Sequence, residues 1–291
     1  IGKGKIEEVA ALLAAYDANG VICDDELSPA QMNNLERELD CKVMDRTLLI
    51  LDIFAGRATT SEGKIQVELA QLRYRSARLV GLRESLSRLG GGIGTRGPGE
   101  KKLETDRRLI RTRISALKAE LAQVEKHREL IRGKRSRGNL KTAAIVGYTN
   151  AGKSTLLNTL TGAGILAEDK LFATLDPTTR VLELKDGQQI LLTDTVGFIR
   201  KLPHHLVEAF KSTLEEAKYA DYIIHVVDAS NPQAELQMHT VYETLRELGA
   251  TGKKIITLLN KQDQVQGEAL RDFRADYTVK CSARTGEGLE E

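Results

Sequence analysis

One glycine-rich stretch has the residue types and the spacing of a phosphate-binding loop. Residues 147–154 read Gly-Tyr-Thr-Asn-Ala-Gly-Lys-Ser and fit the pattern G-x-x-x-x-G-K-[ST] without a substitution. Glycines let backbone N–H groups curl around phosphate oxygens, and the start of a following helix adds partial positive charge. We expect Lys153 to reach the β- and γ-phosphates and Ser154 to bind Mg²⁺. The predicted nucleotide contacts in this loop are Gly147, Tyr148, Thr149, Asn150, Ala151, Gly152, Lys153, Ser154 and Thr155.

Two later segments indicate that the nucleotide is GTP. Residues 260–263, Asn-Lys-Gln-Asp, directly follow an apolar stretch and resemble the N-K-x-D motif that reads guanine in the GTPase superfamily. The Asp263 carboxylate would accept hydrogen bonds from guanine N1–H and its exocyclic amine, and adenine offers neither in that geometry. Asn260 and Lys261 would brace the base and the phosphate-binding loop. Residues Ser282, Ala283 and Arg284 resemble the S-A-[KR] loop that contacts the guanine oxygen.

A carboxylate and a glycine predict a nucleotide-dependent switch. Residues 194–197, Asp-Thr-Val-Gly, follow an apolar strand and resemble the D-x-x-G motif. Asp194 would hold Mg²⁺ through water, and the Gly197 N–H would sense the γ-phosphate, so loss of that phosphate would release the loop. The predicted nucleotide contacts here are Asp194, Thr195, Val196 and Gly197.

The segment between the phosphate-binding loop and this motif is expected to be the other switch. Residues 172–177, Phe-Ala-Thr-Leu-Asp-Pro, resemble the effector loop of Obg-like GTPases, whose threonine completes the Mg²⁺ shell. Counting from Ser154, Thr174 matches best, with Thr178 and Thr179 as alternatives. The predicted metal ligands are therefore Ser154, Thr174 and Asp194, and the predicted nucleotide contacts are Phe172, Ala173, Thr174, Leu175 and Asp176.

The residue after the D-x-x-G motif limits the catalysis that this chain performs alone. Ras-like proteins place Gln there to orient the attacking water, and this chain has Phe198. We expect slow intrinsic hydrolysis, completed by a partner or by a monovalent cation. Asn150 lies where potassium-stimulated GTPases carry an asparagine that helps to hold K⁺, which could supply positive charge near the β–γ bridge. The predicted catalytic residues are Asn150, Lys153, Thr174 and Gly197.

Residues 139–291 alternate strands with helices, which predicts a doubly wound, mostly parallel sheet. The ligand of such a sheet binds at the carboxyl ends of its strands, where the motifs above lie. We expect strands at 143–146, 181–184, 189–194, 222–228, 254–260 and 277–281, and helices at 154–161, 206–217, 234–248 and 268–274.

The chain before this GTPase domain divides into two further regions. Residues 1–62 predict a small α/β unit with helices at 6–16, 30–39 and 47–55 and strands at 20–23 and 42–44. Residues 63–138 carry leucines and isoleucines at helical spacing on both sides of a glycine-rich loop, which predicts two long helices paired antiparallel. The loop contains G-x-G-x-x-G, but it follows a helix and lacks a βαβ unit, so it is no dinucleotide site. The second helix is rich in Arg and Lys, which favours either RNA contact or a solvated helix face.

Composition excludes several classes of protein. The three cysteines, Cys23, Cys41 and Cys281, form no C-x-x-C pair, so neither a zinc site nor a disulfide framework is indicated. No apolar run approaches the ~18 residues of a membrane span, and a formal net charge of +2 is nearly neutral. We expect a cytoplasmic monomer. The chain begins at Ile1 and stops at Glu291 after a glycine-rich turn, so we also expect it to be truncated.

Three segments together resemble the HflX family of GTPases. They are residues 91–100 (Gly-Gly-Ile-Gly-Thr-Arg-Gly-Pro-Gly-Glu) with 103–108 (Leu-Glu-Thr-Asp-Arg-Arg), residues 24–31 (Asp-Asp-Glu-Leu-Ser-Pro-Ala-Gln), and the phosphate-binding loop. The resemblance covers essentially the whole chain and implies a GTPase that binds the large ribosomal subunit near the peptidyl transferase centre. In that family the N-terminal region and the hairpin contact ribosomal RNA and promote splitting of stalled ribosomes under stress. The predicted ribosome contacts are Gly92, Gly94, Arg96, Arg107 and Arg108.

Three alternatives to ribosome splitting stay open from the sequence. The chain could be a ribosome assembly GTPase, or a GTP-gated RNA-binding module that turns over little GTP. It could also be a regulatory switch whose hairpin binds a protein partner by helix pairing. RNA docking through phosphate contacts weakens steeply with salt, whereas apolar helix pairing does not.

Overall fold

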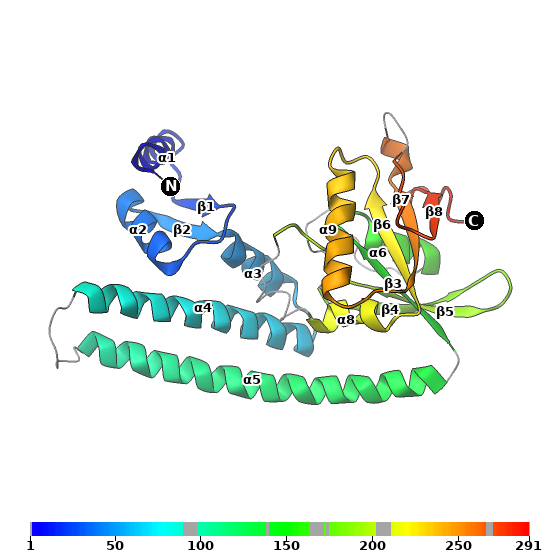
Figure 1. Cartoon of the computed structure of the whole chain (residues 1–291), viewed down its shortest axis with the longest axis horizontal. Helices are drawn as coiled ribbons and strands as arrows, with labels where there is room; N and C mark the ends of the chain where they lie inside the picture. The colour runs from blue at the N-terminus through cyan, green and yellow to red at the C-terminus, as the bar shows by residue number, and fades with distance from the viewer. Residues whose placement is uncertain are drawn as a thin grey trace. The chain divides into compact units, whose positions relative to one another are not determined.

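The computed structural model describes residues 2–89, 98–137, 140–162, 172, 175–201, 211–265 and 270–290 (Figure 1). The chain forms two compact units. The first consists of residues 1–56 and 64–123, and the second of residues 57–63 and 124–291. A short N-terminal segment therefore belongs with the C-terminal domain.

A six-stranded sheet is the centre of the second unit. Its order is β4-β5-β3-β6-β7-β8, and every neighbouring pair is parallel except β4 with β5. The strands are β3 (Lys141–Gly147), β4 (Thr178–Glu183), β5 (Gln189–Asp194), β6 (Tyr222–Asp228), β7 (Lys254–Asn260) and β8 (Tyr277–Lys280). The prediction of a doubly wound, mostly parallel sheet is confirmed.

Alternate residues of the central strands face opposite layers of helices. Leu258 packs in the cluster that contains Leu156 of α6 (Lys153–Thr161), whereas the next residue, Leu259, packs with Met238 of α9 (Ala234–Glu247). Side chains of a strand alternate between faces, so a continuous apolar run supplies both cores. The other described helices of this unit are α8 (Lys211–Tyr219) and the short 3-10 helix η1 (Gln262–Gln264).

The expected helix at 268–274 is wrong over its described part, residues 270–274, which form a loop. Asp272 explains the difference. One carboxylate oxygen accepts hydrogen bonds from the hydroxyls of Thr257 and Tyr242, both at 2.7 Å, and the other accepts from the backbone N–H of Arg274 at 3.0 Å. An Asp that bonds the N–H two residues ahead offers the backbone an alternative to a helix.

The small α/β region forms as expected in the first unit. Its elements are α1 (Lys3–Ala15), β1 (Gly20–Cys23), α2 (Pro29–Leu39), β2 (Lys42–Asp45) and α3 (Arg46–Arg57), with β1 parallel to β2. Ser28 begins α2 in a capping box, because its hydroxyl accepts from Gln31 N–H and the Gln31 side chain accepts from Ser28 N–H. Met32, Leu35 and Val43 form the core of this region.

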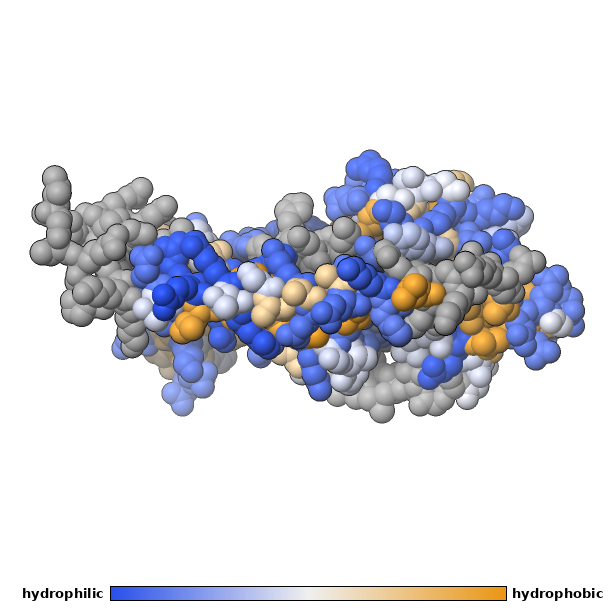
Figure 2. Space-filling model, turned by 90° about the horizontal axis from the view of Figure 1, so that it is seen from below, coloured by the Kyte–Doolittle hydropathy of each residue, from blue (hydrophilic) through white to orange (hydrophobic). Residues whose placement is uncertain are grey.

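Two long helices form the antiparallel hairpin that the sequence predicts. They are α4 (Ser61–Leu89) and α5 (Pro98–Arg137), and Arg113 of α5 binds Glu68 of α4 at 2.7 Å. Leu117 of α5 is fully buried. In Figure 2 hydrophilic residues dominate the described surface, and apolar residues form small separated groups. Within the described part of the chain, no helix is both long and apolar enough to cross a membrane.

A buried carboxylate joins the end of β2 to helix α4 within the first unit. Asp45 accepts hydrogen bonds from the Tyr74 hydroxyl at 2.7 Å and the Arg78 guanidinium at 2.8 Å. It also accepts from the N–H groups of Leu48 at 2.8 Å and Leu27 at 3.2 Å. Burial alone would raise the pKa of Asp45, but these donors outweigh it and lower the pKa below its ordinary value.

We expect Asp45→Asn to lower the free energy of unfolding at pH 7 by about 3 kcal/mol, because it leaves Arg78 without its buried partner. The ionised carboxylate stabilises the fold above the unfolded-state pKa of about 3.9, and this contribution is lost as pH falls through the lower folded-state pKa. Urea unfolding at several pH values should therefore show a weaker acid dependence in the variant. Equal midpoints for variant and wild type at pH 7 would contradict this role.

Candidate nucleotide-binding site

Two glycines shape the phosphate-binding loop between β3 and α6. A side chain at Gly147 would place its Cβ 2.3 Å from the Val226 carbonyl oxygen of the neighbouring strand, so the loop leaves the sheet where only glycine fits. Gly152, at φ +97°, begins α6 and has no side chain with which to cap it. A helix that starts this way favours an anion at its N-terminus.

The amino group of Lys153 folds back against the backbone of the phosphate-binding loop. It donates to the carbonyl oxygen of Tyr148 at 2.9 Å, and Lys153 is only 6% exposed. Burial lowers the pKa of Lys153 to about 8, and the nearby negative charge of Asp194 partly opposes that shift. A buried cation at this place is suited to compensate phosphate charge.

A hydroxyl and a carboxylate meet beside Lys153. Ser154 Oγ donates to Asp194 Oδ2 at 2.7 Å, and β5 carries Asp194 beside β3. Thr195 fixes the end of β5, because its hydroxyl donates to the carbonyl oxygen of Ile145 at 2.8 Å. Hard oxygen donors such as these suit Mg²⁺, which usually takes one or two protein ligands and completes its shell with phosphate and water. No group of three or more His, Cys, Asp or Glu that could hold a metal exists among the described residues.

The segment after Asp194 is attached to the loop by backbone hydrogen bonds. Thr149 N–H donates to the Phe198 carbonyl at 2.8 Å, and Phe198 N–H donates to the Gly147 carbonyl at 3.0 Å. Gly197 lies so close that a Cβ there would be 2.7 Å from Thr149 Cα and 3.0 Å from Lys153 Nζ. The Phe198 side chain is 2% exposed. It is apolar and buried, so it cannot orient water.

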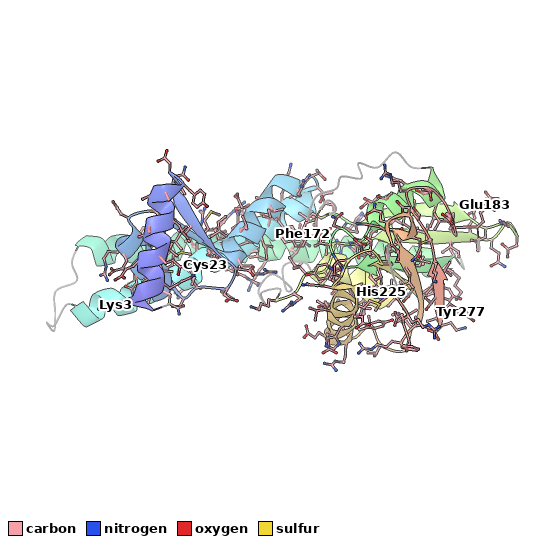
Figure 3. The ribbon with its side chains drawn as sticks, turned by 90° about the horizontal axis from the view of Figure 1, so that it is seen from above. Lys3, Cys23, Phe172, Glu183, His225 and Tyr277 are labelled. Atoms are coloured by element: carbon pink, nitrogen blue, oxygen red, sulfur yellow. The ribbon has the colours of Figure 1, made fainter. Side chains whose placement is uncertain are left out.

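The predicted switch segment before β4, residues 172–177, also touches the loop in its described part, and we call it the first switch segment. Phe172 N–H donates to Thr149 Oγ1 at 3.0 Å, and the Phe172 side chain is buried (labelled in Figure 3). Leu175 is buried as well, and the Asp176 carboxylate accepts hydrogen bonds from Thr59 and Thr60.

The structure describes two of the three threonines that are candidate metal ligands, Thr178 and Thr179. Thr174 lies outside the described residues, as does Ala173. Thr178 pairs with Asp194 at the start of β4. Thr179 Oγ1 lies 3.0 Å from Thr193 Oγ1. The choice of Thr174 as the metal ligand stays a prediction.

Asn260 connects the two loops predicted to read the base, residues 260–263 and 282–284, to the phosphate-binding loop. Its amide nitrogen donates to the Ala151 carbonyl at 2.8 Å, and its amide oxygen accepts from Ala283 N–H at 2.8 Å. The residue is 2% exposed, so both bonds are shielded from water. One side chain therefore sets the spacing between loops that follow three different strands.

Asp263 is held in place by the second base-reading loop. Ser282 Oγ donates to Asp263 Oδ1 at 2.7 Å, and this bond lowers the pKa of the exposed carboxylate, with a smaller contribution from the positive charge of Arg284. An ionised carboxylate is the acceptor that guanine N1–H and its exocyclic amine require.

Two further predicted nucleotide contacts differ in exposure. Thr155 at the start of α6 is partly buried, and Arg284 is exposed.

Sequence reasoning missed three residues that bind predicted site residues, namely Asp228, Thr59 and Thr60. Lys261, at φ +63°, forms an ion pair with Asp228 at 2.7 Å, and Thr59 and Thr60 bind Asp176. Asp228 had a usable signal, because it ends β6 beside Asn260 at the end of β7. Thr59 and Thr60 had none, since they lie more than a hundred residues from their partner.

The predicted ribosome contacts lie apart from this site in the chain. Gly92, Gly94 and Arg96 fall outside the described residues. Arg107 and Arg108 belong to α5, where Arg107 is partly buried and Arg108 is exposed.

Three family models match successive parts of the chain. Residues 1–55 match one described as GTP-binding GTPase N-terminal, residues 57–135 match GTP-binding GTPase Middle Region, and residues 142–261 match 50S ribosome-binding GTPase.

Curated relatives are similar over all or most of the chain. GTPase HflX of Lacrimispora saccharolytica is 72% identical over 292 residues, which cover 100% of this chain and 69% of the relative. GTPase HflX of Escherichia coli is 48% identical over 295 residues, with coverage of 100% and 69%. GTPase HflX of Caldanaerobacter subterraneus is 59% identical over 266 residues, which cover 91% of this chain and 62% of the relative.

A solved structure shares the fold. It is a GTP-binding protein from the hyperthermophilic archaeon Sulfolobus solfataricus in complex with GDP. The sequence identity is 29% and the TM-score is 0.54, with coverage of 100% of this chain and 82% of that one.

We expect Gly152→Ala to weaken GDP binding by roughly tenfold, because a Cβ there would lie 2.3 Å from Asn260 Nδ2 and displace the bridge to the loop. Gly187→Ala is the matched control. That glycine also has a positive φ, +79°, but a Cβ would meet nothing within 4 Å. Titration with a fluorescent GDP analogue measures both, and equal affinities would show that the close contact is unimportant.

Proposed function

We propose that this chain, which belongs to the HflX family of GTPases, is a GTP-hydrolysing switch that binds the large ribosomal subunit. The observation that carries the proposal is the combination of regions in one chain. A nucleotide site, in which hydrogen bonds fix the residues proposed to read guanine, is joined to the N-terminal and middle regions of the family. The relatives from Lacrimispora saccharolytica and Caldanaerobacter subterraneus are longer than this chain, which covers 69% and 62% of them, so the activity of the whole protein is part of the proposal.

Each part of the nucleotide has a group that suits it. Asp263 accepts from the guanine edge, and Asn260 and Lys261 hold that loop against its neighbours. Lys153 and the start of α6 bind the phosphates. The Gly197 N–H reports the γ-phosphate, because Gly197 packs directly on the loop.

Mg²⁺ is the metal that the site suits best. Ser154 would ligate it directly and Asp194 would hold it through water, since their oxygens already lie 2.7 Å apart. We propose Thr174 as the third ligand, with Thr178 and Thr179 as alternatives. The bound metal would neutralise charge that develops on the phosphate oxygens.

The hairpin supplies the proposed RNA contacts. Arg108 is exposed on α5 and Arg107 is partly so, and guanidinium groups pair well with phosphate oxygens. With Gly92, Gly94 and Arg96, they are proposed to touch ribosomal RNA in the cytoplasm, with the chain acting as a monomer. The outcome we favour is splitting or rescue of stalled ribosomes, as the family resemblance implies.

The first test measures GTP hydrolysis with and without purified large ribosomal subunits. We expect stimulation of roughly a hundredfold or more, because buried Phe198 leaves the free protein without a water-orienting side chain. Rates that do not change with added subunits would favour a passive RNA-binding module. Separation of intact ribosomes in a density gradient distinguishes splitting from an assembly role.

Arg107→Glu combined with Arg108→Glu should reduce co-sedimentation with large subunits about tenfold or more, because phosphate contacts become repulsive. The affinity for GDP should stay unchanged, since neither residue is among the predicted nucleotide contacts. Lys185→Glu combined with Lys218→Glu, two exposed charges of the GTPase domain, makes a charge-matched control. Equal losses in both pairs would indicate general electrostatic attraction and not a hairpin contact.

We propose K⁺ as a second cation at Asn150, which is exposed on the phosphate-binding loop at φ +64°. Hydrolysis should be faster in KCl than in NaCl at equal ionic strength, and Asn150→Ala should remove the difference while it leaves the rate in NaCl unchanged. Equal rates in the two salts for wild type would rule out this role.

A further inference from the structure

A carboxylate of the first switch segment is bound by a turn far away in sequence. Thr59 donates to Asp176 Oδ2 through its N–H at 3.1 Å and through its hydroxyl at 2.9 Å. Thr60 N–H donates to the same oxygen at 3.0 Å, and the Thr60 hydroxyl donates to Asp176 Oδ1. Four hydrogen bonds from two residues is a full complement for a carboxylate. All of these residues belong to the second compact unit.

The same turn begins helix α4. Thr60 precedes Ser61, the first residue of α4, and Thr60 Oγ1 accepts from Gly63 N–H at 3.0 Å in the first turn. We refer to residues 59–63 as the Thr59–Gly63 turn. The bound carboxylate therefore lies at the positive end of a helix dipole.

Gly63 makes room for the carboxylate. A Cβ at position 63 would lie 2.3 Å from Asp176 Oδ1, which no side chain tolerates. Burial raises the pKa of Asp176, but the hydrogen bonds from Thr60 and Thr59 outweigh burial and lower it below the ordinary value. The carboxylate is thus ionised at neutral pH, and its binding turn is shaped to it.

Asp176 lies between two attachments to the nucleotide site. On one side, Phe172 N–H binds the side chain of Thr149 in the phosphate-binding loop. On the other, Thr178 pairs with Asp194, whose carboxylate accepts from Ser154. Asp176 lies four residues after Phe172 and two before Thr178, so fixing Asp176 limits the reach of the chain to either attachment.

We propose that Asp176 is a positioning residue for GTP hydrolysis and that the Thr59–Gly63 turn, by binding its carboxylate, holds the first switch segment in the geometry that the reaction needs. The start of α4 then acts as part of the GTPase site although it is remote in sequence. Because the turn also begins α4, a change in the switch segment on hydrolysis is felt at the first turn of that helix. Asp176 itself makes no contact with substrate under this proposal.

The test uses variants that remove the contact from either side. Asp176→Asn weakens the acceptor, Thr60→Val removes a donor hydroxyl, and Gly63→Ala displaces the carboxylate while Asp176 stays intact. In single-turnover hydrolysis at saturating GTP, all three should lower the rate constant by roughly tenfold, because misplaced groups lose near-attack geometry. The KM for GTP and the affinity for GDP should change less than about twofold, since the phosphate and base loops are untouched.

Two controls match these variants. Thr60→Ser keeps the hydroxyl and should restore the rate. Gly56→Ala adds a methyl group to a helix a few residues earlier, where a Cβ meets nothing within 4 Å, and should leave the rate unchanged. Thermal unfolding of every variant separates a lost fold from a lost position.

A second measurement reports the contact itself. The N–H groups of Thr59 and Thr60 are donors to Asp176, so their hydrogen exchange should be slow in wild type and faster in Asp176→Asn and Gly63→Ala. Exchange at these two amides should also differ between the GDP-bound protein and the protein with a non-hydrolysable GTP analogue.

Two results would overturn the proposal. If Gly63→Ala and Thr60→Val hydrolyse GTP at the wild-type rate while exchange at Thr59 and Thr60 rises, the contact is only a helix cap. If Asp176→Asn alone lowers the rate, or raises KM strongly, Asp176 acts on the nucleotide directly and the turn does not position it.

Discussion

The Asn260 side chain is the constraint on which the nucleotide site depends. It spans the Ala151 carbonyl and the Ala283 N–H, so the loops after β3, β7 and β8 share one buried donor and acceptor. A shorter or apolar side chain would leave both backbone groups buried and unpaired, which costs more than a hydrogen bond at the surface. The parallel sheet brings the loop ends to one edge, and the amide sets how far apart they stand. The positions of Asp263 and Ser282 follow from that distance.

Charge at the site is arranged in close opposite pairs. Lys153 lies near Asp194, which ends β5, and Lys261 pairs with Asp228, which ends β6. A buried lysine near a carboxylate keeps its charge more readily than one alone, although burial still lowers its pKa. A phosphate bound here would interact with a lysine and with the positive N-terminus of α6. The carboxylates nearby are already paired with lysines and would repel it less than isolated ones.

Local patterns in the sequence were sufficient for the sheet and for the motifs that end its strands. Apolar residues lie on both faces of β6 and β7 because both faces are buried, and the bounds of these strands were predicted as observed. Contacts that depend on distant partners were not accessible. Nothing near Thr59 signals that it binds Asp176, and the helix expected through Asp272 fails because that carboxylate bonds Thr257 and Tyr242 on other elements. Helix and strand propensities depend on residues close in sequence, whereas the Asp176 and Asp272 carboxylates bind donors that are close only in space.

The backbone bonds that join Phe198 to Gly147 and Thr149 have a consequence for how this protein can evolve. Every residue except proline has the same backbone donor and acceptor, so other substitutions at position 198 change the side chain without removing the attachment of the loop. The backbone attachment of the loop and the chemistry of the side chain at position 198 can therefore change independently in evolution. A lineage can exchange Phe198 for a residue with a polar side chain while the segment after β5 keeps its backbone attachment to the loop.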